Sequence, residues 1–182
     1  MSQKPSLEKE DLSFFEVLRR RHSIRSYTDK EVEDWKLKQI LEASNSSPSA
    51  GNLQAYDIFV VRNKRKKHAL AKAAGGQDFI SEAPMVLVFC ATPSRSSWKY
   101  GSRGEQLYCI QDATIAAAYA QLAATALGLA SIWVGAFDEK EALEVLGQKS
   151  EFRPLVIMPI GYTFEKPEIT PRRRLEECLH II

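Results

Sequence analysis

The chain has 182 residues, 45% of them apolar, which is enough for one domain with a substantial core and too few for two ordinary domains. A formal net charge of +2 gives no argument for nucleic acid or an anionic membrane as a partner, and we expect neither. The three cysteines form no C-x-x-C pair, which favours neither a disulfide framework nor a zinc site. Segment 1–12 is polar, unlike a secretory signal, so we expect a cytoplasmic protein.

Helices and strands can be placed from capping residues and apolar periodicity. Ser13 and Glu16 have the spacing of a capping box, which predicts a helix start with Phe14, Val17 and Leu18 on its apolar face. In chain order, the next expected elements are a helix over 31–44, a loop over 45–54, a strand over 57–62, a basic helix ended by Gly75 and Gly76, a strand over 85–91, a loop over 92–104, a helix over 106–127, a strand over 131–137, a helix capped by Asp138 with Glu141, and a strand over 155–162.

Three segments carry further expectations. Residues 115–137 contain no charge, but Gln121 and Gly128 favour a buried helix followed by a strand over a membrane span. The polar segment 92–104, with Trp98 and Tyr100, is expected to be a long mobile loop of the kind that forms lids. The tail 165–182 has too little around it to fold alone, so we expect it to dock on another surface.

Common catalytic signatures are missing from the sequence. It contains no nucleophile elbow, no zinc-protease helix motif, no phosphate-binding P-loop and no dinucleotide fingerprint. The three histidines, His22, His68 and His180, lack the spacing of metal ligands, so no metal is expected. The basic run 63–67 is interpreted as a solvated helix face.

The segment Arg21-His22-Ser23-Ile24-Arg25 follows the first predicted helix. Guanidinium groups and a hydroxyl match phosphate oxygens in charge and geometry, so the segment is a candidate phosphate site. Cations at a helix end also occur simply because they interact well with the helix dipole and with water. The segment alone leaves both interpretations open.

Five separated segments together resemble the FMN-dependent nitroreductase family. They match in order from about Phe14 to His180, which is nearly the whole chain. The segments are Arg21-His22-Ser23-Ile24-Arg25-Ser26-Tyr27, Ser47-Pro48-Ser49-Ala50-Gly51-Asn52-Leu53-Gln54, Trp133-Val134-Gly135-Ala136-Phe137-Asp138, Pro159-Ile160-Gly161-Tyr162, and the arginines Arg172-Arg173-Arg174 before Leu175-Glu176-Glu177.

The resemblance implies an α+β fold in which helices wrap a mixed central sheet. It also implies one domain over 1–182 and an interlocked homodimer with two FMN sites at the interface, the tail 165–182 docking on the partner subunit. The expected cofactor-binding residues are Arg21, His22, Ser23, Arg25, Pro48, Ser49, Ala50, Asn52, Gln77, Val134, Gly135, Ala136, Arg172 and Arg173.

The family pattern gives these residues different roles. Arg21, Ser23 and Arg172 would hold the FMN phosphate, with Arg173 as a substitute for Arg172, and Arg25 would lie near the pyrimidine edge of the ring. The loop that carries Pro48, Ser49, Ala50 and Asn52 would come from the partner subunit. The backbone N–H at Gly135 would point at flavin N5, where a small residue permits close approach.

The sequence departs from the family pattern at two places. Ala55-Tyr56 stands where the family commonly has Pro-Trp, which leaves the shape of that turn open. Larger members place an Asn and a Lys near the flavin pyrimidine, and Gln77 is the uncharged candidate to replace them here.

The function implied by the resemblance is hydride transfer from NAD(P)H through FMN to a small oxidant, such as a nitroaromatic, a quinone or free flavin, with ping-pong kinetics. A specialised alternative within the family is reductive dehalogenation or flavin cleavage. An alternative from another class is a non-enzymatic basic binding module that uses Lys64 to Lys67 and Arg172 to Arg174.

Overall fold

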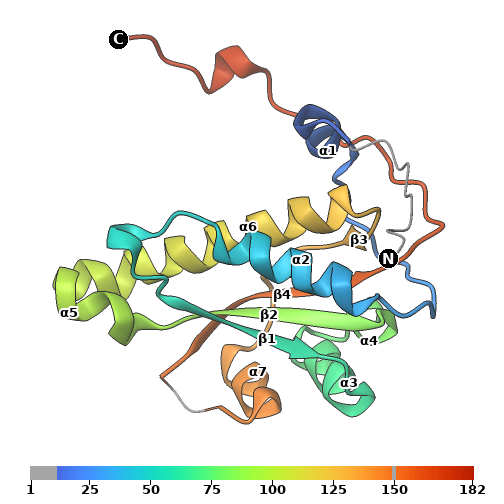
Figure 1. Ribbon diagram of the computed structural model, residues 1–182, viewed down its shortest axis with the longest axis horizontal. Coiled ribbons are helices and arrows are strands. Elements are labelled where there is room, and N and C mark those ends of the chain that lie inside the picture. The colour runs from blue at the N-terminus through green and yellow to red at the C-terminus, as the bar shows by residue number, and fades with distance from the viewer. Residues whose placement is uncertain (1–11, 149–150) are drawn as a thin grey trace, which may run out of the picture.

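A computed structural model describes residues 12–148 and 151–182, and its centre is a four-stranded sheet (Figure 1). The strand order is β1-β2-β4-β3, and all three pairings are antiparallel. A parallel contribution comes from an isolated bridge between Ser23 and Ser131. The α+β class is thereby confirmed. The strands are β1 Tyr56–Val61, β2 Met85–Ala91, β3 Ala130–Ser131 and β4 Arg153–Gly161.

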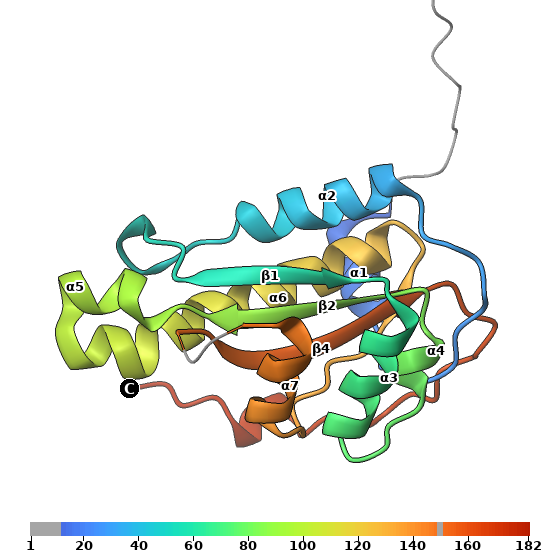
Figure 2. The same cartoon turned by 90° about the horizontal axis from the view of Figure 1, so that it is seen from below.

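Helices cover both faces of this sheet, as Figures 1 and 2 show from two sides. Helices α2 and α6 pack on one face, and α3, α4 and α7 pack on the other. The bounds of these helices are α2 Asp34–Asn45, α3 Lys64–Ala73, α4 Phe79–Glu82, α6 Cys109–Ala126 and α7 Glu139–Leu146.

The sequence of β2 explains why the sheet is covered twice. Every residue of this strand is apolar and buried. Side chains of a strand alternate between faces, so Leu87 and Phe89 enter the core under α2 and α6, while Val86 and Val88 enter the core under α3 and α7. A strand with two apolar faces is stable only between two layers of helices.

The N-terminal helix α1 (Phe14–Arg20) begins with the predicted capping box. The backbone N–H of Glu16 donates to Ser13 Oγ (3.3 Å), and the Ser13 N–H donates to Glu16 Oε2 (3.0 Å). Val17 is buried, but Phe14, Phe15 and Leu18 are exposed. In Figure 1 the helix lies outside the main body, beside the C-terminal tail.

The prediction of a loop over 92–104 is wrong. Residues Pro93–Arg103 form helix α5, which is kinked at Gly101 (φ 55°, ψ −142°), and a π-helical turn over Gly104–Tyr108 follows. Proline and glycine are also typical of loops, but Pro93 and Gly104 have other functions here. Pro93 occupies the first helical turn, where its missing N–H does no harm. Gly104 packs so closely that a Cβ there would lie 2.5 Å from the Ser96 carbonyl oxygen.

Two smaller predictions also need correction. The strand expected over 131–137 is limited to Ala130–Ser131, after which Val134 forms only an isolated bridge with Ile157. Lys67, expected on a solvated helix face, is buried, and its ammonium donates to the carbonyl oxygens of Ala83 and Pro84. Burial lowers the pKa of Lys67 from its ordinary value.

The tail extends away from the body after β4 and carries a short helical turn, η3, at Leu175–Glu177 (Figure 1). Within the described ranges 12–148 and 151–182, no helix has the length and apolarity needed to cross a bilayer. The tail's large apolar side chains are all strongly exposed: Phe164, Ile169, Leu175, Leu179, Ile181 and Ile182.

A polar network fixes the end of β4 against α2. The Tyr162 hydroxyl donates to Glu33 Oε2 (2.6 Å) and accepts from Lys36 Nζ (2.8 Å), which also donates to the Leu127 carbonyl oxygen (2.8 Å). The hydrogen bond from Tyr162 is the main cause that lowers the pKa of Glu33 to about 2. The network therefore joins α2, the end of α6 and the end of β4 in one place.

We expect this network to make stability depend on pH in acid. The pKa of Glu33 is lower in the folded chain than its ordinary value of 4.5, so its contribution is complete above about pH 4.5 and is lost as the pH falls toward 2. Tyr162→Phe should lower the free energy of unfolding at pH 7 by about 1 kcal/mol, because the Glu33 side chain is partly solvated, and should flatten this acid dependence. Urea unfolding at several pH values measures both effects. Tyr119→Phe, at a half-exposed tyrosine elsewhere on the chain, is the control and should change neither.

Candidate functional site

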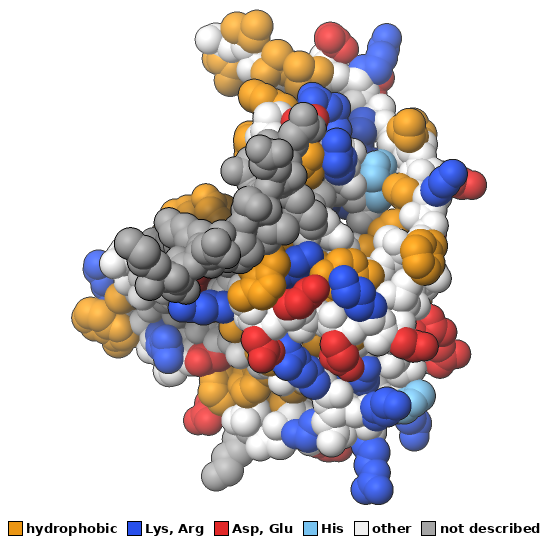
Figure 3. Space-filling model, turned by 45° about the vertical axis from the view of Figure 1, so that its right-hand side comes forward, with side chains coloured by type: hydrophobic (Ala, Val, Ile, Leu, Met, Phe, Trp, Pro, Cys, Tyr) orange, Lys and Arg blue, Asp and Glu red, His pale blue; other side chains and the backbone are white. Residues whose placement is uncertain are grey.

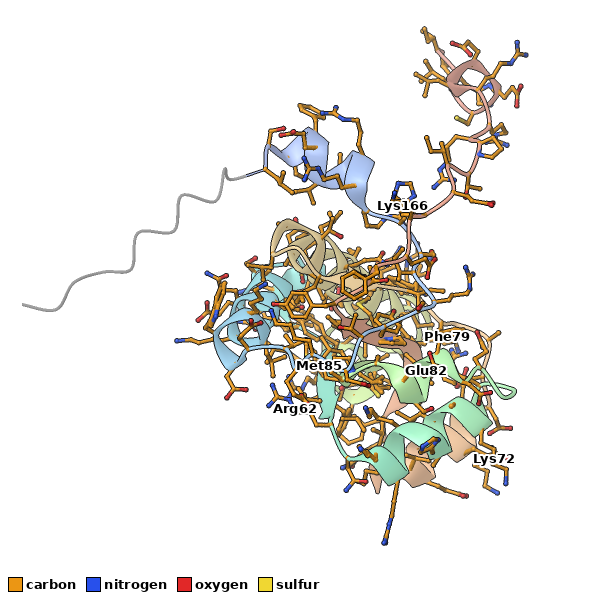
Figure 4. All side chains as sticks on the ribbon, turned by 90° about the vertical axis from the view of Figure 1, so that its right-hand side faces the viewer. Arg62, Lys72, Phe79, Glu82, Met85 and Lys166 are labelled. Carbon is orange, nitrogen blue, oxygen red and sulfur yellow. The ribbon has the colours of Figure 1, made fainter. Side chains whose placement is uncertain are left out.

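A cavity of about 580 Å³ lies between the segment that follows α1 and the start of the C-terminal tail. Lys166, labelled in Figure 4, lies where the tail passes the end of α1. Figure 3 shows Lys and Arg side chains gathered in the upper part of the molecule, close to a histidine. The cavity is lined by Arg21, His22, Ser23, Arg25, Glu165, Lys166, Pro167, Glu168, Thr170 and Arg172.

Local backbone structure explains how the first cations reach this cavity. Helix α1 ends at Arg20, and Arg21 is already extended, with φ −68° and ψ 112°. The following residues run along the sheet edge, where the Ile24 N–H donates to the Ser131 carbonyl oxygen (3.2 Å). In an extended chain alternate residues share a face, which places Arg21, Ser23 and Arg25 toward the cavity and Ile24 in the core. His22 departs from this alternation, because it also lines the cavity.

The tail is tied to the same segment by a carboxylate. The Arg25 N–H donates to Glu165 Oε2 (3.0 Å), and the Thr28 N–H donates to the Tyr162 carbonyl oxygen (2.8 Å). These bonds place the start of the tail beside residues 21–25, so Arg172 reaches the cavity. Sequence reasoning missed Glu165, Lys166, Glu168 and Thr170, because nothing in the tail shows that it turns back past α1.

The charge of the cavity suits a phosphate monoester. Four cationic side chains line it, against two carboxylates. In the segments that the structure describes, Arg21, Arg25 and Arg172 form no ion pair with an acidic side chain. Their guanidinium groups are therefore available to an anionic ligand, and the Ser23 hydroxyl adds a donor. Arg173 does not line the cavity, so Arg172 is the better-placed tail cation.

A second group of predicted residues lies elsewhere in the chain. Pro48, Ser49 and Ala50 line a separate cavity of about 470 Å³ at the start of α6, which shares no lining residue with the first. The neighbours of Arg21 and Ser23, namely Arg20, His22 and Ile24, instead line a cavity at the other end of α6, together with Thr125. Asp112, in the second cavity, and Thr125 are separated by about 20 Å of helix. One chain thus holds two separated parts of the predicted site.

The third group surrounds Gly135. Val134 is fixed to Ile157 by two backbone hydrogen bonds of 3.0 Å, whereas Gly135 and Ala136 are exposed. A Cβ at Gly135 would have only Trp133 Nε1 within 4 Å, at 3.8 Å, so the space above this backbone is open. The structure brings Gln77 here, where its amide nitrogen donates to the carbonyl oxygens of Ala74 (2.9 Å) and Ala136 (3.3 Å). In this orientation Gln77 offers a ligand an acceptor and holds the turn that follows Gly135.

Comparison with known proteins matches most of the chain to one protein family. The model of the nitroreductase family matches residues 18–77 and 68–162. The chain is 33% identical to an FMN reductase [NAD(P)H] of Bacillus subtilis over 87% of its length and 69% of that protein. It is 30% identical to an NADH dehydrogenase of Thermus thermophilus over 88% of its length and 91% of that protein.

A solved structure, the NADPH:FMN oxidoreductase of Vibrio harveyi complexed with NAD+, has the same fold. It superposes with a TM-score of 0.84 at 26% identity, covering 92% of this chain and 76% of the other. The family match over residues 18–162, the curated relatives and the shared fold all give the same family. The chain belongs to the nitroreductase family.

Proposed function

We propose that this chain passes hydride from NAD(P)H through FMN to a small oxidant, such as a nitroaromatic, a quinone or free flavin, in the cytoplasm. Membership in the family makes the chain an NAD(P)H-dependent oxidoreductase with FMN as its cofactor. This removes the alternative of a non-enzymatic basic binding module. The cationic cavity between residues 21–25 and the tail is the observation that carries the proposal.

The residues of the cavity bind and orient the cofactor. Arg21, Ser23 and Arg172 would hold its phosphate, and Arg25, on the same extended segment, would supply a positive charge beside the ring. When bound, FMN supplies N5, the atom that takes hydride from NAD(P)H and gives it to the oxidant. The exposed backbone at Gly135 would leave room for the ring to approach, because no side chain blocks it.

Steady-state kinetics test the reaction. The chain has no dinucleotide fingerprint, so donor and acceptor should use one open slot in turn, and NAD(P)+ should leave before the oxidant enters. We expect parallel double-reciprocal lines when NADH or NADPH is varied at several quinone or nitroaromatic concentrations. Intersecting lines would contradict the shared slot. Turnover only with a halogenated aromatic, or loss of the flavin itself, would favour the specialised alternatives.

The separation of the two cavities supports a homodimer in which each site uses residues from both chains. Loop 48–52 of one subunit would complete the site built from residues 21–25 and 134–136 of the other. The tail 165–182 would dock on the partner, because its apolar side chains and those of Phe14, Phe15 and Leu18 are exposed in a single chain.

We expect light scattering at micromolar concentration to give the mass of two chains, with FMN bound. Because the dimer covers the apolar side chains of α1, Phe15→Glu should shift the protein toward smaller, FMN-poor species. Lys72→Glu, which places the same carboxylate at an exposed position of α3, far from α1 in Figure 4, is the control and should stay dimeric. A folded monomer that retains FMN would contradict the shared site.

A further inference from the structure

We propose that Asp112 is a positioning residue that holds the loop Ser49–Ala55 in its cofactor-binding shape. This inference rests on the function proposed above, because it assigns the loop to the flavin site. Asp112 belongs to the first turn of α6, and 1% of its surface is exposed.

Both oxygens of this carboxylate accept hydrogen bonds from the loop backbone. Ala50 N–H donates to Oδ1 (2.9 Å), and Ala55 N–H donates to Oδ2 (3.2 Å). Carboxylate acceptors make stronger bonds to backbone N–H groups than neutral acceptors do. A single side chain therefore binds the loop near both of its ends and fixes the distance between them.

The loop between these two points needs such support because its backbone is strained. Three of its residues have positive φ: Gly51 (59°), Asn52 (59°) and Gln54 (44°). Asparagine adopts the left-handed region more readily than most residues, but positive φ is unfavourable at Gln54 and persists there only where the surrounding structure enforces it. The conformation of Gln54 is thus supported by external bonds, among them the bonds of the loop to the buried Asp112 carboxylate.

The same loop carries residues assigned to the cofactor. Ser49 precedes the first hydrogen bond, Ala50 makes it and Asn52 lies between the two, and the Ser49 hydroxyl accepts from the Gln54 N–H (3.0 Å). Helix α5 also packs against the loop, since a Cβ at Gly51 would lie 2.4 Å from the Tyr100 hydroxyl oxygen. The loop is held by α6 and α5 before any cofactor arrives, which lowers the entropy lost on binding.

Asp112→Asn tests this role, because it keeps the shape and replaces one acceptor oxygen with an NH₂ donor. Ser44→Ala is the control, since it removes a buried hydroxyl on α2, just before the loop, which within the described residues bonds to the Ile40 carbonyl oxygen and to no part of the loop. In the FMN-free protein, we expect amide hydrogen exchange at Ala50 or Ala55 to become at least about tenfold faster in Asp112→Asn and to stay unchanged in Ser44→Ala.

A second readout connects the loop to the cofactor. We expect the Kd for FMN to rise about tenfold in Asp112→Asn, with an altered visible circular dichroism band of any bound flavin, whereas Ser44→Ala keeps both. Unchanged exchange, or faster exchange with unchanged FMN affinity and spectrum, would overturn the proposal. If wild-type protein binds FMN and Asp112→Asn binds it equally well, only this inference fails. If wild-type protein binds no FMN, the proposed function fails.

The test also covers a variant that does not fold. In that case the wild-type, FMN-free protein is measured alone, and Ala50 and Ala55 should exchange at least about tenfold more slowly than unprotected amides of the same residue type. Exchange at the unprotected rate would show that Asp112 does not hold the loop, and would overturn the proposal.

Discussion

Replacing Arg21 with alanine should weaken FMN binding by one to two orders of magnitude while leaving the fold intact. A charge-assisted bond to phosphate contributes about 1.5 to 3 kcal/mol, which corresponds to roughly 10- to 150-fold in Kd. Arg21 follows the last residue of α1, forms no ion pair within the described residues and belongs to neither hydrophobic core cluster. Its loss should therefore affect the ligand before it affects stability.

The matched control for Arg21→Ala is Arg19→Ala. Arg19 carries the same charge two residues earlier, is exposed on α1 and does not line the cavity. Fluorescence titration of FMN into the FMN-free variants gives both dissociation constants, and thermal unfolding gives their stabilities. If Arg21→Ala kept full FMN occupancy on dilution, the phosphate would have to bind at another part of the chain, and the assignment of Arg21 would be wrong.

Replacing Arg25 with glutamine should lower the midpoint potential of the bound flavin and slow its reduction by NAD(P)H. Arg25 lines the same cavity two positions beyond Ser23, and its backbone is fixed by Glu165. A cation beside the ring favours the negative charge that the ring gains on reduction. Allowing for solvent screening, an interaction of about 1.4 kcal/mol corresponds to roughly 30 mV for a two-electron couple.

Two measurements check the prediction for Arg25. A potential titration measures the midpoint, and anaerobic stopped-flow absorbance measures the rate of reduction. The affinity for FMN should change less than in Arg21→Ala, because Arg25 acts on the ring rather than on the phosphate. Arg65→Gln, at an exposed cation on α3 outside the cavity, should change neither value. An unchanged potential in Arg25→Gln would place this cation away from the ring.

Local signals predicted the helices and strands well where one cause dominates. The capping box at Ser13 and Glu16, the Asp138 cap of α7 and the apolar run of β2 each leave few alternatives. The prediction of a loop over 92–104 failed because Pro and Gly occur both in loops and at helix ends. Tertiary packing, namely the contact of Gly104 with Ser96, decides between a loop and a helix end. This contact cannot be predicted from the sequence alone.

The candidate site was predicted by motif rather than by geometry. The sequence indicated Arg21, Ser23 and Arg25 from their chemistry, and their alternation on an extended segment explains how they share a cavity. It did not indicate Glu165, whose role depends on a hydrogen bond across 140 positions of the chain. Nor did it indicate Asp112, since a single carboxylate in a predicted apolar helix has no local signal for the loop it binds.

The central claim is that the cationic cavity binds the phosphate of FMN, and a comparison of FMN with riboflavin tests it most directly. Riboflavin has the same ring and ribityl chain but lacks the phosphate. Titration of the FMN-free protein with each, followed by flavin fluorescence, should give at least about 100-fold tighter binding of FMN, because two or more charge-assisted bonds are lost with riboflavin. Equal affinities for FMN and riboflavin would contradict the assignment of Arg21, Ser23 and Arg172 to the phosphate.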